Sequence, residues 1–270
     1  MAFSSIQRLR PTQFPRAAGE QLRVARRAAA FLVVAILVAT VSAFGANAEL
    51  EKQRAALDPA DPDLGVRERL SVLVERVKLE QNHVKTMSAR FRQEKTSTML
   101  LEPSTDIGLF YYEAPDRVRW EYEEPEAMLV VINGEELVTF YEEQNLAEKA
   151  SVGEISEQVF KYLGASGSLE KLAEFFEVTA YFPEEEGDPY HLVLDPRYSR
   201  IQNRLQGMEI WIDPESYQPT RFKYLQPGGD ETSYRFDDLV LNEDLEDSLF
   251  EVQLPEGTQV RTIDLKKQGR

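Results

Sequence analysis

Residues 108–141 read GLFYYEAPDRVRWEYEEPEAMLVVINGEELVTFY, and along them strand signals alternate with turn signals. On either side of Trp120, apolar and charged side chains alternate with a period of two, which predicts a strand buried on one face. Residues 127–132 are apolar throughout, so we expect the next strand to be covered on both faces. Asn133 and Gly134 tolerate positive φ and predict a hairpin into a third strand. The stretch therefore predicts a curved antiparallel sheet with a large apolar face.

Outward from this stretch, the chain predicts a few helices and a second run of strands. Apolar residues recur at helical spacing over residues 66–86, which indicates a helix with one apolar stripe. Residues 151–176 predict two short helices, interrupted near Gly164 and restarted by a cap at Ser168. Turns rich in proline and glycine then separate further strands at the regular spacing of an antiparallel meander. These predicted strands are residues 178–182, 190–194, 205–212, 220–225 and 232–241.

The N-terminal residues 1–48 are typical of an export signal. Basic residues end at Arg27, and no charged side chain occurs over residues 28–48. Ala46 and Ala48 supply the small side chains that a signal peptidase requires. We predict that residues 1–48 are a signal peptide that is cleaved on export. The alternative is a retained anchor, because an uncharged segment of 21 residues is long enough to span a bilayer.

Residues 49–65 contain two Asp-Pro steps, which break helices, so we predict a linker there and a single domain over residues 66–270. The aspartates of this segment lack the alternating spacing of a calcium-binding loop, and we predict no metal site. The roughly 222 residues after the signal are enough to bury roughly 70% of the unfolded surface around one core.

Composition excludes several classes of protein. The chain has no cysteine, which excludes disulfides, thiolate chemistry and a lipid-modified N-terminus. Its formal net charge is −16, and loss of residues 1–48 would make it −21. So strong a negative charge, with no basic stripe in the sequence, argues against binding to nucleic acid and against adsorption to an anionic bilayer.

The sequence shows no catalytic motif. Its two histidines, His83 and His191, accompany neither a nucleophile motif nor metal-ligand spacing. The many carboxylates form no specific acid–base pair, and the glycines match no phosphate-binding loop. We therefore expect a protein that is not an enzyme and needs no cofactor.

Short motifs along the chain occur in the order of a known family. The motifs are Met87–Gln93, Gly108–Tyr111, Pro115, Arg119–Trp120, Val131–Gly134 and Leu249–Val260. Together they resemble the LolA-like lipoprotein carrier family, periplasmic chaperones that shuttle lipid-modified proteins from the inner to the outer membrane. The resemblance spans roughly residues 64–264.

This resemblance implies an α+β fold, an incomplete, half-open antiparallel β-barrel with helices covering its concave face. It implies a monomeric periplasmic carrier that binds acylated lipoproteins or lipids. Its partners would be an inner-membrane release transporter and an outer-membrane acceptor. The alternative function is a lipid- or lipoprotein-sensing regulatory module on the same fold, which signals to a membrane partner.

The half-barrel further implies an apolar, lipid-binding cavity between the sheet and its helices. The expected wall residues are Phe91, Tyr111, Trp120, Tyr122, Leu129, Val131, Trp211 and Tyr224. The expected lid residues are Val159, Phe160, Leu163 and Phe176. From the sequence pattern alone, the alternative is a core that side chains fill completely.

One position departs from the family pattern. Many members carry an arginine immediately before the proline at position 115, and this arginine is implicated in release of the cargo lipoprotein. In this chain the residue is Ala114. Arg117 and Arg119 are close in sequence but alternate with Trp120, so we expect them on the opposite face of the strand.

Overall fold

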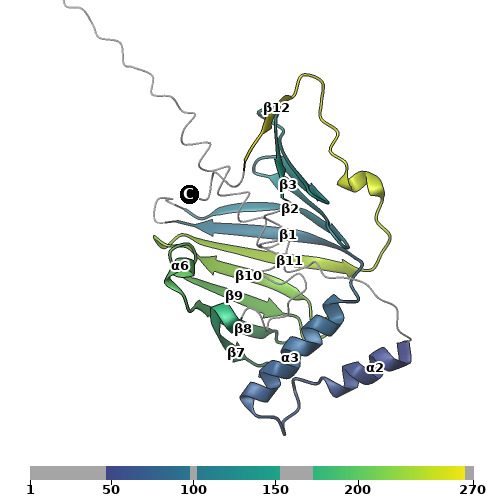
Figure 1. Cartoon of the computed structure of the whole chain (residues 1–270), viewed down its shortest axis with the longest axis vertical. Helices are drawn as coiled ribbons and strands as arrows, with labels where there is room; N and C mark the ends of the chain where they lie inside the picture. Colours follow the sequence, from purple (N-terminus) through teal and green to yellow (C-terminus); the bar gives the residue numbers. More distant parts are fainter. Residues whose placement is uncertain (1–46, 98–101, 153–172, 265–270) are drawn as a thin grey trace, which may run out of the picture.

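The structure is a computed structural model that describes residues 47–97, 102–152 and 173–264 (Figure 1). Within these ranges, twelve strands form one sheet in the order β12-β6-β5-β4-β3-β2-β1-β11-β10-β9-β8-β7. The strands are β1 (Thr86–Thr96), β2 (Ser104–Glu113), β3 (Arg117–Glu124), β4 (Met128–Asn133), β5 (Glu136–Tyr141), β6 (Leu146–Ser151), β7 (Phe176–Tyr181), β8 (Tyr190–Pro196), β9 (Gly207–Ile212), β10 (Pro219–Leu225), β11 (Glu231–Leu241) and β12 (Gln259–Thr262). The helices are α2 (Asn47–Ala56), α3 (Val66–Gln81), α6 (Ser199–Gln202) and the 3₁₀ turn η1 (Asp247–Phe250).

The sheet is open and almost entirely antiparallel. Only β12 runs parallel to its neighbour, β6, among the strand pairs of the described residues. The two outermost strands, β12 and β7, are not paired with each other there, so the barrel is incomplete. The predicted α+β fold with a half-open antiparallel barrel is confirmed. No helix among the described residues is both long and apolar enough to cross a membrane.

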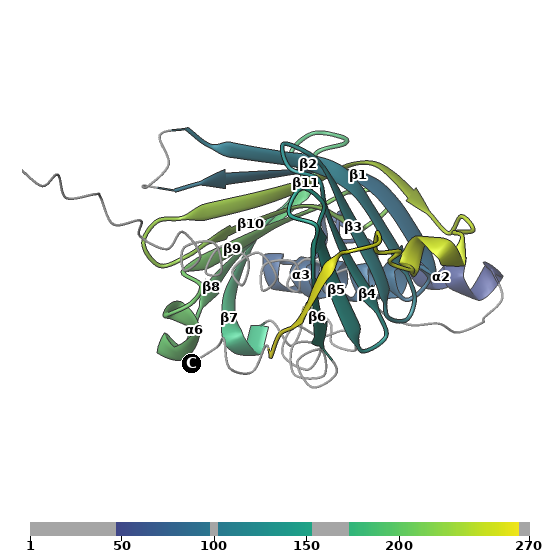
Figure 2. The same ribbon diagram turned by 90° about the horizontal axis from the view of Figure 1, so that it is seen from above.

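The concave face of the sheet follows from the alternation of side chains along each strand. In β3, Val118, Trp120 and Tyr122 are at most 4% exposed, whereas the residues between them are half-buried. Helix α3 lies under the curve of the sheet (Figure 2), and its Leu73 and Val77 join the same core. The core therefore lies between this helix and the concave face, as the resemblance implied.

Strand β4 is buried on both of its faces, as its apolar run predicted. Val130 is 1% exposed on the concave side, and Val131, which points the other way, is 2% exposed. The predicted hairpin into β5 is also confirmed. Gly134 begins its two-residue loop with a φ of 60°, a conformation that glycine adopts without the steric cost of a side chain.

The C-terminal segment covers the outer face of β3 and β4. Arg119 Nη1 donates a hydrogen bond to the carbonyl oxygen of Leu249 at 3.0 Å, and Arg117 Nη1 pairs with Asp247 at 2.6 Å. Phe250 is 1% exposed in this contact. The segment then reaches β12, which lies beside β6 (Figure 2). Arg117 and Arg119 thus lie on the outer face, as predicted, and their role there is to hold the C-terminal segment.

Some predicted boundaries are wrong. The segment predicted as a linker over residues 49–65 is partly helical, because its Asp-Pro steps come after the end of α2 and do not interrupt it. The predicted helix over 66–86 ends at Gln81, and Thr86 already begins β1. Phe176, predicted at the end of a lid helix, is the first residue of β7 instead.

Candidate functional site

Trp120 lies at the centre of an aromatic cluster on the concave face. Its ring centroid is 4.7 Å from that of Phe110 and 4.8 Å from that of Phe91. The rings of Tyr234 and Phe236 follow at 5.7 and 5.6 Å. These distances, with tilted or edge-on ring planes, are typical of favourable aromatic packing. All five side chains are at most 5% exposed.

Strand register brings these rings together from distant parts of the chain. Phe110 pairs with Trp120 between β2 and β3, and Phe91 pairs with Phe236 between β1 and β11. Because paired residues share one face of a sheet, the rings form a single patch across four adjacent strands. The same face continues as an apolar surface on β10, β9 and β8 through Phe222, Ile210 and Leu192.

A small polar network lies within this apolar face. Gln93 Nε2 donates to Tyr234 Oη, and Tyr122 Oη donates to Gln93 Oε1 at 3.2 Å. Gln93 is 1% exposed, so tyrosines satisfy its amide in place of water. Burial raises the pKa of Tyr234 well above its ordinary value, and the hydroxyl therefore stays protonated. The network positions the rings without adding a charge to the face.

The family model of the outer membrane lipoprotein carrier protein LolA matches residues 82–253, which include every strand from β1 to β11. The chain belongs to the LolA family.

Two relatives that are named lipoprotein carriers agree with this assignment. The outer-membrane lipoprotein carrier protein of Alkalilimnicola ehrlichii is 30% identical over 183 residues, 66% of this chain and 78% of that protein. The carrier protein of Azotobacter vinelandii is 27% identical over 213 residues, 76% of this chain and 92% of that protein. Among solved structures, an uncharacterized conserved protein from Thermus thermophilus has a TM-score of 0.48 and 15% identity, covering 72% of this chain and 99% of that one.

Five of the residues that the LolA resemblance assigned to the cavity lie together on the concave face. They are Phe91, Trp120, Tyr122, Phe176 and Tyr224, each at most 9% exposed. Three further residues, Val159, Phe160 and Leu163, lie outside the described residues. A role of any of them in binding stays a prediction.

The other four predicted wall residues, Tyr111, Leu129, Val131 and Trp211, are on the outer face, so their placement on a cavity wall is wrong. Tyr111 and Val131 are both paired with Arg119, which points away from the concave side. Leu129 is two residues before Val131 in the same strand. Trp211 alternates with the inward, buried side chains of β9. A shift of one residue along a strand exchanges its two faces, and this explains all four errors.

Sequence reasoning also missed inward-facing aromatic residues. Phe110, Tyr112 and Tyr234 are 0% exposed on the concave face. Phe110 can be identified by its pairing with Trp120, and the others by alternation along their strands. In β2, however, consecutive aromatic residues make that alternation impossible to see in the sequence.

Ala114, at the position where many LolA-family members carry arginine, lies in the turn between β2 and β3. Its backbone N–H donates to the carbonyl oxygen of Lys85 at 2.7 Å, and its side chain packs against the core. Arg117 and Arg119 are held on the outer face by the C-terminal segment. Neither of them can take the place of an arginine at position 114 without breaking those contacts.

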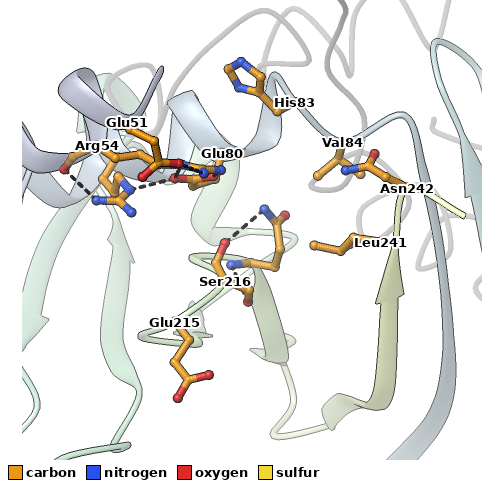
Figure 3. A pocket seen from close by; sticks show the side chains of 11 residues that line it. Glu51, Arg54, Glu80, His83, Val84, Glu215, Ser216, Leu241 and Asn242 are labelled. Atoms are coloured by element: carbon orange, nitrogen blue, oxygen red, sulfur yellow. Dashed lines mark hydrogen bonds and ion pairs between the residues drawn. The ribbon is translucent and has the colours of Figure 1, made fainter. Parts of the chain in front are cut away.

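A polar cavity of about 350 Å³ lies between α2, the end of α3 and the turn between β9 and β10 (Figure 3). Glu80, which is 8% exposed, accepts hydrogen bonds at 2.8 Å from the Nε atoms of both Arg54 and Arg76. Burial acts to raise the pKa of Glu80, but the hydrogen bonds from the two arginines outweigh it and lower the pKa. The cluster ties α2 to α3, so this part of the predicted linker packs against the domain.

Replacing Glu80 by glutamine should lower the free energy of unfolding by about 2 kcal/mol at pH 7, because two arginines lose their carboxylate partner. The pKa of Glu80 is lower in the folded state than its ordinary value of 4.5, so the carboxylate stabilises the fold above that pH. This contribution is lost as the pH falls through the folded-state pKa. Urea unfolding of both proteins at pH 7 and pH 3 measures the effect, and the difference should shrink at pH 3.

The matched control is Glu75→Gln, five residues earlier on α3, where the side chain is 43% exposed. It should change the free energy of unfolding by less than about 0.5 kcal/mol. A Glu80→Gln variant as stable as this control would contradict the role of the cluster.

Proposed function

We propose that this chain is an exported periplasmic carrier, which binds the acyl chains of lipoproteins or lipids and shuttles them between the inner and outer membranes. Membership of the LolA family supports the proposal. The observation that carries it is the concave face around Trp120, where aromatic and aliphatic side chains from seven adjacent strands form one apolar surface. Such a surface suits an acyl chain in its chemistry.

The energy of an exposed acyl chain explains why a soluble carrier needs this surface. A 16-carbon chain in water costs about 0.8 kcal/mol per methylene, roughly 12 kcal/mol in all. When an acyl chain enters the concave face, contacts between apolar side chains are lost. Contacts between those side chains and the acyl chain replace them. Since apolar contacts are non-directional, the exchange costs little net free energy in either direction. Binding and release then need neither a covalent step nor a cofactor.

In this proposal, the signal peptide of residues 1–48 is removed and the carrier works between two membrane partners. An inner-membrane transporter supplies the acylated protein, and an outer-membrane acceptor receives it. Ala114 favours a second candidate, a sensor that binds lipoprotein or lipid on the same face and signals to a membrane protein. A sensor has no need of the arginine that is implicated in release.

The two tryptophans of the chain give a direct test, because they lie on opposite faces of the sheet. In a Trp211→Phe variant, Trp120 is the sole reporter of the concave face. A lipopeptide with brominated acyl chains should quench its fluorescence in a saturable manner, since bromine quenches a tryptophan that it contacts. Addition of acceptor vesicles should restore the fluorescence if the protein is a carrier.

The matched control is the Trp120→Phe variant, in which Trp211 reports from the outer face and should stay unquenched by the same lipopeptide. Quenching of neither tryptophan, with no co-purifying lipid, would mean that the concave face is a filled core and would refute acyl binding. Quenching of Trp120 without transfer to vesicles would support the sensor over the carrier.

A further inference from the structure

Six directly paired residues form a line across the outer face of the sheet, one on each of six neighbouring strands. We call them the outer row: Tyr181, His191, Trp211, Arg221, Arg235 and Arg92. At about 4.8 Å per strand, the row extends roughly 24 Å from β7 to β1. One half of it consists of rings and the other half of guanidinium groups.

The aromatic half is a continuous stack. The ring centroids of His191 and Trp211 are 4.4 Å apart with planes tilted by 5°, and Tyr181 stacks on His191 at 5.4 Å. On the next strand, the guanidinium carbon of Arg221 lies 4.2 Å from the centre of the Trp211 ring. This cation–π contact fixes the first arginine beside the last ring. Tyr181, at the far end, is 56% exposed.

The cationic half places three like charges next to one another. Arg235 is paired directly with both Arg221 and Arg92, and like charges at paired positions destabilise a sheet. Arg235 has an ion pair with Asp237 at 2.9 Å, but its side chain stays 68% exposed. Arg92 and Arg221 are also exposed, and within the described residues they make no ion pair. By contrast, Lys223 beside the row is neutralised by two glutamates.

A cavity of about 650 Å³ opens beside Trp211 and Arg221, where β10 and β11 diverge. Arg221 and Arg235 of the outer row line it together with three aspartates, Asp213, Asp237 and Asp238. The charge of the aspartates opposes entry of an anion into the cavity itself. The three aspartates outnumber the two arginines of the lining, so an anionic partner meets the arginines from the exposed outer face and does not enter the cavity.

We propose that the outer row docks the protein on the surface of a bilayer that contains anionic phospholipids. Planar guanidinium groups form paired hydrogen bonds with phosphate oxygens, and three of them stand in line here. Tryptophan and tyrosine favour the boundary between head groups and acyl chains, which is where the adjoining stack would lie. The inference does not depend on acyl binding at the concave face.

The charge of the rest of the molecule makes this contact selective for one face. The chain has a net charge of −16, so most of its surface is repelled by the same bilayer. Because salt screens charges beyond about 8 Å, the arginines act locally when the outer face approaches. The docked state is therefore oriented, weak and sensitive to salt.

Vesicle flotation of the exported protein at low ionic strength tests the proposal. Vesicles of phosphatidylcholine with phosphatidylglycerol should bind the protein, and vesicles of phosphatidylcholine alone should not. Each arginine near an anionic surface contributes a factor of about five in affinity. Three such factors multiply to about a hundredfold, and the ion pair of Arg235 with Asp237 reduces its share, so the triple variant R92Q/R221Q/R235Q should bind at least about tenfold more weakly.

The matched control is R67Q/R200Q/R261Q, which removes the same charge from exposed positions on α3, α6 and β12. It should weaken binding less than about twofold. In the Trp120→Phe variant, brominated phospholipids in the vesicles should quench Trp211, which places the outer face on the bilayer. Far-UV circular dichroism and urea unfolding check that each variant is folded.

Failure of the protein to bind the anionic vesicles would overturn the proposal, and so would equal losses in the two triple variants. Binding to a polyglutamate peptide that requires the outer row, without binding to vesicles, would also overturn it and assign the row to an acidic protein partner.

Discussion

Replacing Gly108 by alanine should lower the free energy of unfolding by about 3 kcal/mol, and the melting temperature by about 6–12 °C. A Cβ at this position would lie 1.9 Å from the carbonyl oxygen of Glu121 and 2.9 Å from Cε1 of Phe91. The first of these atoms is backbone of the neighbouring strand, so β2 and β3 would have to separate. The absence of a side chain at Gly108 is what lets the Phe91 ring lie over the sheet. Urea and thermal unfolding would measure the loss.

Gly207→Ala is the matched control, because a Cβ at Gly207 meets no heavy atom within 4 Å. Both glycines lie in strands, at the bulge of β2 and at the start of β9. The control should alter the free energy of unfolding by less than about 1 kcal/mol, in either direction. If the two variants were equally stable, the close approach of β2 and β3 at Gly108 would be wrong.

Phe250→Ala should cost about 3 kcal/mol, because a fully buried aromatic side chain is removed from the contact between η1 and the outer face. The loss should also loosen the C-terminal segment, whose other contacts there are mainly polar. Asn133 Nδ2 donates to the carbonyl oxygen of Phe250 at 3.3 Å, and the Arg117 guanidinium lies 5.1 Å from its ring centre. Limited proteolysis should therefore cut within residues 242–259 faster in the variant.

Val260→Ala, in β12 at 52% exposure, controls for a change of apolar area in the same segment. It should lower the free energy of unfolding by no more than about 0.5 kcal/mol and leave proteolysis unchanged. Unaltered stability and unaltered cleavage in Phe250→Ala would show that η1 does not anchor the segment.

The fold could be predicted from sequence where the information is local. In β3, Trp120 stands between charged residues, so the alternation defines both the strand and its buried face. The hairpin at Gly134 is likewise encoded by neighbouring residues. The helix α2 could not be predicted in this way. It depends on the ion pair between Arg54 and Glu80, which are 26 residues apart.

The faces of several strands could not be predicted, and the reason is physical. Phe110, Tyr111 and Tyr112 are consecutive aromatic residues, so hydrophobicity does not indicate which of them points inward. Trp211 follows Ile210 in β9 and is apolar too, but it faces outward because His191 and Arg221 cover its two ring faces. Large apolar side chains on an outer face need such cover, and the residues that provide it come from other strands.

The outer row could not be predicted from the sequence, for a related reason. Its arginines come from β1, β10 and β11, and no two of them are close together along the chain. The sequence therefore showed no basic stripe, and net charge alone argued against contact with an anionic bilayer. Strand pairing concentrates these charges, and net charge contains no information about pairing.

The pairing of β1 with β11 also has a kinetic consequence. The strands β1 to β6 and β7 to β11 each pair mainly with neighbours in sequence, but among the strand pairs of the described residues the two halves join where residues 86–96 meet residues 231–241. Closing so long a loop is slow, because its entropy must be lost before the contacts form. A chain that emerges N-terminus first, from a ribosome or through a membrane pore, can join its halves only after residue 241 is free. The aromatic patch around Trp120 spans the junction between β1 and β11. It is therefore among the last parts of the molecule to assemble.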